Sequence, residues 1–161
     1  MNESVEPQSG AITQTQVEDE FEELDVESGP TVGIVMGSKS DMPVMEKAGK
    51  ELEERQIRYE IRVMSAHRQP DVVAEYAKNA QMRGLKVIIA GAGLAAALPG
   101  VVAAHTDLPV IGVPLTSSTS VAGGLDALLA IVQMPPGVPV ACVGVDNARN
   151  AAVLAARMLA A

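Results

Sequence analysis

From Thr31 to the end of the chain, runs of apolar residues alternate with amphipathic segments, and the connections between them are short. The first run, Thr31–Met36, is rich in β-branched residues and is typical of a strand that is covered on both faces. Tyr59–Val63 alternates with period two and predicts a second strand. The pattern as a whole predicts five strands, at residues 31–36, 59–63, 87–90, 110–113 and 138–143.

Helices are predicted between these strands by apolar positions at helical spacing. Met45, Ala48 and Leu52 share one face of a helix that Asp41 can cap, with Pro43 in its first turn. Three further helices are expected at residues 70–82, 125–133 and 148–159, and the first of these is ended by Gly84. Another helix is expected in the small-residue segment after Gly93, with an interruption at Leu98-Pro99-Gly100.

The strict alternation of strands and helices predicts right-handed crossovers and a parallel sheet with helices on both faces. We therefore expect residues 31–161 to form a single α/β domain of three layers (α/β/α), a flavodoxin- or Rossmann-like fold with five parallel strands. Sheets of this kind bind ligands beyond the carboxyl ends of their strands, at a topological switch point. The residues that follow each strand are therefore the ones to inspect for chemistry.

Charge is distributed unevenly along the 161 residues, whose formal net charge is −8. Residues 1–30 contain nine acidic residues and no Lys or Arg, whereas residues 31–161 contain 11 acidic and 12 basic residues. The composition of residues 1–30 predicts an acidic, disordered N-terminal extension that acts as a solubilising tail. The alternative is a docking motif built on Phe21 and Leu24.

Composition also excludes several classes of protein. One cysteine cannot form an internal disulfide, so a disulfide-stapled secreted scaffold is excluded. No apolar run reaches the ~18 residues of a membrane span, and the acidic start does not resemble a signal or transit peptide. We therefore expect a cytoplasmic protein without a membrane partner. Residues 31–161 lack Phe, Trp and a basic stripe, so we expect no nucleic-acid partner either.

The first predicted strand is followed by Gly37-Ser38-Lys39-Ser40-Asp41. Glycine permits a tight turn, Ser38 and Ser40 offer hydroxyl groups, and the start of the next helix exposes N–H groups with partial positive charge. These features predict a phosphate-binding turn, with an ordinary capped turn as the alternative. The chain contains no GxxxxGK[ST] spacing, so this turn is not a Walker loop.

The second predicted strand is followed by Ser65-Ala66-His67-Arg68-Gln69-Pro70-Asp71. Arginine can bind phosphate with two parallel hydrogen bonds, and an imidazole with a pKa of ~6.5 exchanges protons near neutral pH. A single surface histidine is usually inert, but this one follows a strand that is expected to lie beside the hydroxyl turn. His67 is therefore a candidate general acid and base.

The later strand ends are less specific. Gly91, Gly93 and Ala96 match the dinucleotide-binding pattern, but they follow the third strand and no ribose-binding acid follows the fourth. Small residues here let the backbone approach a compact ligand or a neighbouring subunit. The hydroxyl-rich loop at residues 114–124 either closes over a site or is a mobile connector. His105 and Cys142 are expected to be structural, and two histidines 38 positions apart with one cysteine predict no metal site.

Several segments together resemble one family, over about residues 32–159. These segments are GSKSD (37–41), SAHR with Pro70-Asp71 (65–71), VIIAGAG (87–93), LPG (98–100), PVIGVP (109–114), GLDALLAIVQMP (124–135) and GVPVACV (137–143). They resemble N5-carboxyaminoimidazole ribonucleotide mutase, the class I, small-catalytic-subunit type of phosphoribosylaminoimidazole carboxylase.

The resemblance implies an isomerase of de novo purine (IMP) biosynthesis that interconverts N5-carboxyaminoimidazole ribonucleotide and 4-carboxy-5-aminoimidazole ribonucleotide. It implies no metal, biotin or ATP, a ribonucleotide as the small-molecule partner, and a homo-octamer. The histidine of SAHR, here His67, would be the general acid and base. Phosphate and ribose contacts would be made by Ser38, Asp41 and Arg68, and the base and carboxylate would be lined by Ser40, Ser65, Gly91, Ala92 and Gly93.

The chain departs from the family pattern at three places. Many members carry GGAAHLPG where this chain has GLAAALPG (93–100), so a second histidine is replaced by Ala97. The loop at residues 116–124 is slightly longer than usual. The sequence ends at Ala161, whereas several members continue into a C-terminal helix that helps to lock the octamer.

Three other functions compete with the mutase. A related carboxylase class adds free CO2 to aminoimidazole ribonucleotide, but it tends to have SAHK in place of SAHR, so Arg68 favours the mutase. A cofactor-synthesis enzyme that carboxylates a nicotinate nucleotide shares the distal half of the pattern but fits GSKSD and SAHR poorly. A non-catalytic nucleotide-binding module is the third alternative, because the second histidine is absent.

Overall fold

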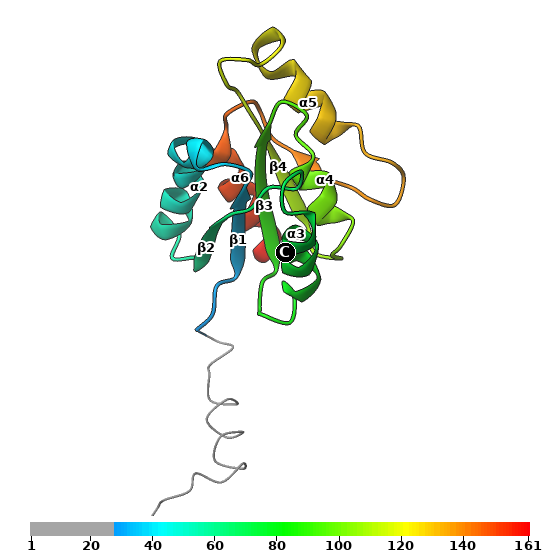
Figure 1. Ribbon diagram of the computed structural model, residues 1–161. Helices are drawn as coiled ribbons and strands as arrows, with labels where there is room; N and C mark the ends of the chain where they lie inside the picture. The colour runs from blue at the N-terminus through cyan, green and yellow to red at the C-terminus, as the bar shows by residue number, and fades with distance from the viewer. Residues whose placement is uncertain (1–27) are drawn as a thin grey trace, which may run out of the picture.

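The computed structural model describes residues 28–161. The expected acidic extension and its alternative docking motif fall almost entirely on residues 1–27 and so lie outside the described residues. Five parallel strands form one sheet in the order β2-β1-β3-β4-β5 (Figure 1). The strands are β1 (Val32–Met36), β2 (Tyr59–Val63), β3 (Val87–Gly93), β4 (Val110–Leu115) and β5 (Ala141–Cys142).

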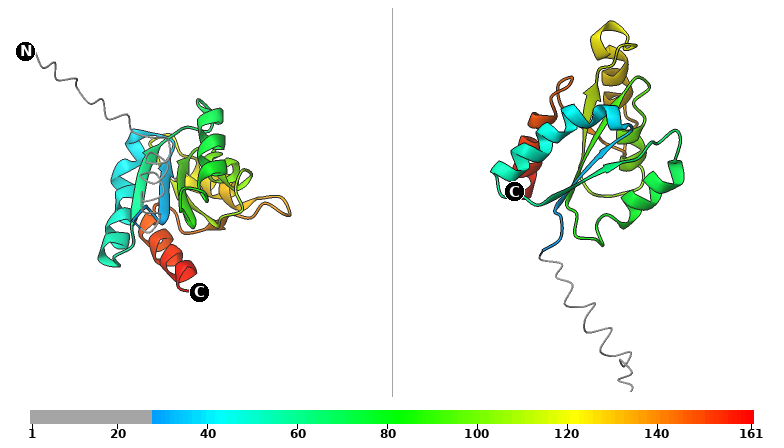
Figure 2. Two further views of the ribbon diagram at one scale, coloured as in Figure 1. Left: turned by 90° about the horizontal axis from the view of Figure 1, so that it is seen from below. Right: turned by 60° about the vertical axis from the view of Figure 1, so that its left-hand side comes forward.

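The helices connect successive strands and lie on both faces of the sheet, as Figure 2 shows. One face is covered by α2 and α6, and the other by α3, α4 and α5. These helices are α2 (Met42–Glu54), α3 (Pro70–Asn79), α4 (Leu98–Ala103), α5 (Leu125–Val132) and α6 (Ala148–Leu159), with short 3₁₀ turns η1 (Lys39–Asp41) and η2 (Ala122–Gly124). The three-layer, flavodoxin-like α/β fold predicted from the sequence is confirmed.

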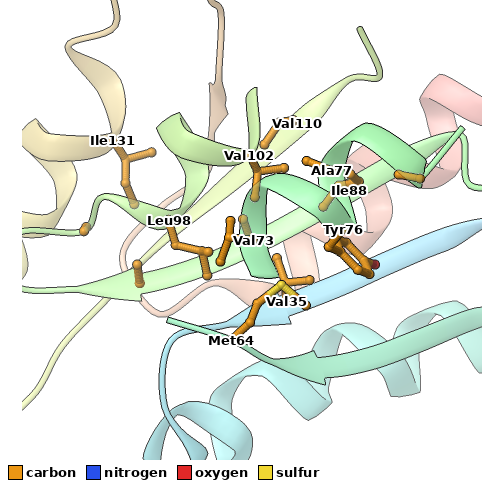
Figure 3. Close-up of a cluster of buried hydrophobic side chains, with 14 of the residues drawn as sticks. Val35, Met64, Val73, Tyr76, Ala77, Ile88, Leu98, Val102, Val110 and Ile131 are labelled. Carbon is orange, nitrogen blue, oxygen red and sulfur yellow. The ribbon is translucent and has the colours of Figure 1, made fainter. Parts of the chain in front are cut away.

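The core is divided into two layers by the sheet, because neighbouring residues of a strand point to opposite faces. Ile34 packs with the helix pair α2 and α6, whereas Val35 packs with the helices of the opposite face. Figure 3 shows the second layer, in which Val73 and Tyr76 of α3 lie beside Val35. Buried apolar area on both faces explains why the strands are almost continuous apolar runs.

Strand β3 is three residues longer than predicted, because it continues through Gly91-Ala92-Gly93. Gly91 pairs in register with Met36 of β1 and Val113 of β4. A Cβ atom at Gly91 would lie only 2.4 Å from the sulfur of Met45, so the absence of a side chain at residue 91 leaves the space that Met45 of α2 fills. Glycine weakens a strand on average, but here it permits close approach of a helix.

Other boundaries also differ from the prediction. Strand β5 is reduced to two residues, and Pro139 removes a backbone donor from the segment before it. Helix α3 ends at Asn79 and is followed by turns up to Gly84, which has a positive φ of 90°. The segment Leu98-Pro99-Gly100 begins α4 and does not interrupt it, because proline is well tolerated in the first helical turn.

One carboxylate is buried between the helices of the first face. Glu51 of α2 is only 5% exposed and accepts hydrogen bonds from Arg149 at the start of α6 (2.6 Å) and from Arg55 (2.9 Å). These bonds hold the pKa of Glu51 below its ordinary value. Within residues 28–161, no helix is both long and apolar enough to cross a membrane.

Candidate active site

A cavity of about 390 Å³ opens at the carboxyl ends of the strands. It lies over β2, β1, β3 and β4, so it includes the switch point between β1 and β3, where the chain reverses its direction across the sheet. It is lined by Gly37, Ser38, Ser40 and Asp41 after β1, Ser65, Ala66, His67 and Arg68 after β2, Ala92 to Leu98 around the end of β3, and Thr116 and Ser117 after β4.

The turn after β1 is built by its own serine and aspartate. The hydroxyl of Ser38 accepts the N–H of Ser40 (3.3 Å) and the hydroxyl of Ser40 (2.9 Å). The N–H of Ser38 in turn donates to the carboxylate of Asp41 (3.1 Å), which completes a capping box around η1. Asp41 occupies the N-cap position of α2, as predicted, with Pro43 in the first turn, but its carboxylate accepts the N–H of Ser38 and makes no cap hydrogen bond with α2.

This internal bonding changes the expected chemistry of the turn. The N–H groups of Ser38, Ser40 and Asp41 all donate within the turn, so they are not the open anion cradle that the sequence predicted. The hydroxyl groups of the two serines still line the cavity. Partial burial raises the pKa of Asp41, and the hydrogen bond from Ser38 opposes that rise.

The second wall of the cavity is the turn after β2. A hydrogen bond from the N–H of Met64 to the carbonyl of Met36 (2.8 Å) extends the pairing of β1 and β2 up to this turn. Ser65 then closes the turn, because its carbonyl accepts the N–H of Gln69 (2.8 Å) and its hydroxyl accepts that of Arg68 (3.3 Å). His67 and Arg68 are thereby presented at the cavity beside the serine turn, and both are solvent-exposed.

Among the residues that line this cavity, Arg68 is the one cationic side chain and His67 the one imidazole. Because a cation and an imidazole lie beside hydroxyl groups and a carboxyl group, the cavity is suited to a small anionic ligand and to proton transfer. Eight of the nine predicted site residues line the cavity: His67, Ser38, Ser40, Asp41, Ser65, Arg68, Ala92 and Gly93.

Gly91 is the exception. It is buried within β3 and is not among the lining residues. Because the strand runs to Gly93, the wall of the cavity is formed instead by the segment from Leu94 to Leu98, which the sequence analysis did not assign. Leu94 adopts a positive φ of 54°, uncommon for a bulky side chain, and is 45% exposed. A longer β3 in the prediction would have pointed to this segment.

The fourth wall is formed by Thr116 and Ser117, which the sequence analysis did not name as site residues. The sequence did show that the loop after β4 is rich in hydroxyl groups, and this composition was compatible either with a loop that closes over a site or with a mobile connector. In the structure the loop is a bonded turn: the N–H of Ser117 donates to the hydroxyl of Ser120 (2.8 Å), and the N–H of Val121 donates to Asp126 (3.1 Å).

The remaining candidate residues lie away from this cavity. His105 follows α4, where its Nδ1 lies 2.9 Å from the carbonyl of Val101, and it lines a separate cavity of about 790 Å³ at the amino-terminal edge of the sheet. Cys142 is half-buried in β5, and burial raises the pKa of its thiol. In the described part of the chain no three His, Cys, Asp or Glu side chains come together in a way that could hold a metal ion.

Comparison with known proteins places the chain in a family. The family model described as AIR carboxylase matches residues 31–161. N5-carboxyaminoimidazole ribonucleotide mutase of Thermotoga maritima is 62% identical over 130 residues, which cover 81% of this chain and 75% of that protein. The corresponding mutase of Pyrococcus abyssi is 60% identical over 130 residues, which cover 81% of this chain and 74% of that protein.

A solved structure supports the same relationship. The crystal structure of Treponema denticola PurE superposes with a TM-score of 0.70 at 35% identity, covering 81% of this chain and 80% of that one. The region that the family model matches includes all the turns that line the cavity. The chain belongs to the AIR carboxylase family.

Proposed function

We propose that this protein is an N5-carboxyaminoimidazole ribonucleotide mutase of purine biosynthesis, an isomerase. The observation that carries the proposal is the meeting of His67 and Arg68 with the serine turn in one cavity at the β1–β3 switch point. The relatives that bear this name are 60% and 62% identical over nearly the whole described region. The substrate is therefore a phosphorylated aminoimidazole ribonucleotide, and no cofactor takes part.

The reaction requires two proton transfers that one imidazole can perform. The bond between the exocyclic nitrogen and the carboxylate carbon breaks, CO2 leaves, and the nitrogen receives a proton from protonated His67. The ring carbon then attacks the same CO2 molecule, and neutral His67 takes the proton that this carbon loses. Atoms and charge balance over the cycle, and such acid–base catalysis contributes typically ~10²–10⁴-fold in rate.

The remaining lining residues bind and enclose the substrate in this proposal. Arg68 binds the phosphate with Ser38, and Asp41 accepts a ribose hydroxyl. Ser40, Ser65 and the backbone at Ala92 and Gly93 line the base and the CO2. Gly91 does not line the cavity and acts indirectly, because the absence of a side chain there leaves room for Met45 of α2. The small side chains of Ala95, Ala96 and Ala97 leave room for the migrating CO2.

The test is the variant His67→Asn. We expect it to lower kcat by ~10³-fold or more while the ribonucleotide still binds, because asparagine keeps a polar side chain but cannot exchange protons near neutral pH. The matched control is His105→Asn, since His105 is the second of the two histidines and lies at the opposite edge of the sheet. An unchanged kcat in His67→Asn would refute the catalytic assignment.

The same assay distinguishes the mutase from a carboxylase that uses free CO2. Turnover of N5-carboxyaminoimidazole ribonucleotide should persist when bicarbonate is limiting, whereas turnover of aminoimidazole ribonucleotide should be slow under those conditions. The opposite preference would support the carboxylase. Binding without turnover of either substrate would support the non-catalytic module.

We further propose that the protein is a cytoplasmic homo-oligomer, with the octamer as the assembly implied by the family resemblance. Supporting the oligomer is an apolar stripe that begins just before α5 and follows it, formed by Val121, Leu125, Leu129 and Val132, each 45–65% exposed. Contiguous exposed apolar surface of this kind marks protein–protein interfaces. A cytoplasmic site follows from the substrate, because a charged ribonucleotide does not cross membranes unaided.

A further inference from the structure

The wall formed by Thr116 and Ser117 is tied to a residue thirty positions further along the chain. The carboxylate of Asp146 accepts the backbone N–H of Thr116 (2.9 Å) through Oδ1 and the hydroxyl of Thr116 through Oδ2. The N–H of Asp146 donates to the carbonyl of Pro114 (2.8 Å). Three hydrogen bonds therefore join Asp146 to the end of β4, at the point where the chain enters the cavity wall.

Asp146 makes these bonds from an uncommon backbone conformation. Its φ is 54°, in the left-handed region that aspartate tolerates better than most residues other than glycine and asparagine. Gly124 packs closely against the same residue. A Cβ atom at Gly124 would lie 3.0 Å from Cγ2 of Thr116 and 3.0 Å from Cγ1 of Val145. Thr116 is thus fixed by a carboxylate and by a glycine-dependent contact.

The direction of these bonds decides what Thr116 can offer to a ligand. Since its hydroxyl donates to Asp146, only the lone pairs of that oxygen remain for a further hydrogen bond. The wall can therefore accept a hydrogen bond from a hydroxyl or amino group of the ligand. This wall follows β4, which is separated from β2, the strand that precedes His67, by β1 and β3. Three strand spacings correspond to about 14 Å, so this wall bounds the far side of the cavity.

We propose that Asp146 is a positioning residue, which holds Thr116 and Ser117 in place as the far wall of the cavity, so that this wall binds the ribonucleotide. Asp146 is not among the residues that line the cavity, so it acts through Thr116. This inference rests on the proposed function.

The test compares three variants in the mutase assay. Asp146→Gly keeps the left-handed backbone accessible and removes the carboxylate, so we expect KM to rise about tenfold, kcat to stay within about threefold and the melting temperature to change little. Asp146→Asn retains an acceptor for the N–H of Thr116 and should restore KM to within about threefold of wild type. Gln56→Gly is the matched control, because Gln56 also has a positive φ, of 59°, but follows the carboxyl-terminal end of α2, whereas the cavity lies at the amino-terminal end of that helix. The KM of Gln56→Gly should equal that of wild type.

The outcomes separate this inference from the proposed function. A wild-type protein without mutase activity would refute the function, and with it the inference. An active wild type with an unchanged KM in Asp146→Gly would refute the positioning role alone. An Asp146→Gly variant in which kcat falls and KM does not would also contradict it, because the wall would then act on the chemical step and not on substrate binding.

Discussion

Arg68 carries the only positive charge among the side chains that line the cavity, and its importance follows from how the neighbouring turn is bonded. Because Ser38, Ser40 and Asp41 use their N–H groups within their own turn, the backbone there contributes less to anion binding than a free helix start would. The guanidinium group must then supply most of the attraction for a phosphate.

We therefore expect Arg68→Ala to raise KM by about 10–100-fold with a smaller change in kcat, since a hydrogen bond to a charged group contributes about 1.5–3 kcal/mol. Arg68→Lys should recover part of the affinity, because an ammonium group retains the charge but not the forked geometry. Steady-state kinetics at several substrate concentrations measure both effects. A normal KM in Arg68→Ala would place the phosphate elsewhere.

Two further residues show how single positions shape the site. Ala97 lies in the wall after β3, and within the cavity His67 has no second imidazole beside it. Leu94, with its positive φ, projects a partly exposed apolar side chain at the same wall. Both side chains are apolar, which favours a dry pocket for CO2 at this wall.

At the scale of secondary-structure elements, Glu51 joins α2 to α6 on one face of the sheet. Its carboxylate is paired with Arg149 from α6 and Arg55 from α2, and these hydrogen bonds lower its pKa from the ordinary value of 4.5. When the pKa of an acidic group is lower in the folded state than in the unfolded chain, ionisation of that group stabilises the fold. The full effect is present when the pH is above the pKa of the unfolded chain. That stabilisation is lost as the pH falls through the folded pKa.

We expect the free energy of unfolding to decline as the pH falls below about 4.5, and Glu51→Gln to be less stable than wild type at neutral pH but less sensitive to acid. Urea unfolding between pH 3 and pH 7 measures both quantities. Glu46→Gln is a control, because Glu46 is an exposed residue of the same helix. Equal acid sensitivity of wild type and Glu51→Gln would show that Glu51 does not contribute.

Glu60 should account for part of the acid sensitivity that remains in Glu51→Gln. Burial raises the pKa of Glu60, but the hydrogen bonds from Arg83, Tyr76 and Arg62 outweigh burial, so its pKa is also lowered overall.

At the scale of the whole molecule, the two faces of the sheet are covered but the outer side of α5 is not. The stripe of Val121, Leu125, Leu129 and Val132 lies on the helix that projects beyond the sheet in Figure 1. In the proposed oligomer a second copy of the chain covers this stripe.

We expect the wild-type protein to sediment as a multi-subunit species and Leu129→Glu to dissociate it, raising the dissociation constant about 100-fold or more, because a charge would be buried without a partner. Val72→Glu serves as the control, since Val72 is similarly exposed, at 49%, but lies on α3. Analytical ultracentrifugation over a range of concentrations gives the result. A monomeric wild type would contradict the proposal, as would a Leu129→Glu variant that stays assembled.

The fold was predictable because its signals are local. Apolar runs such as Thr31–Met36 and the helical spacing of Met45, Ala48 and Leu52 depend on residues that are near one another in the sequence. The boundaries that failed depend on distant contacts. Strand β3 continues through Gly93 because residues 91–93 pair with Val113, Pro114 and Leu115 of β4, which lie more than twenty positions further along the chain.

The sequence by itself determined the order of strands and helices, and therefore that the turns GSKSD and SAHR would both lie at the carboxyl edge of a parallel sheet. Only the tertiary structure decided which distant groups fix the walls of the cavity: that the N–H of Met64 bonds to Met36 of β1, and that Asp146 holds Thr116 from thirty residues away. The physical reason is that periodicity and turn chemistry act over a few residues, whereas the hydrogen-bond partners of a polar group depend on which distant segments packing brings beside it.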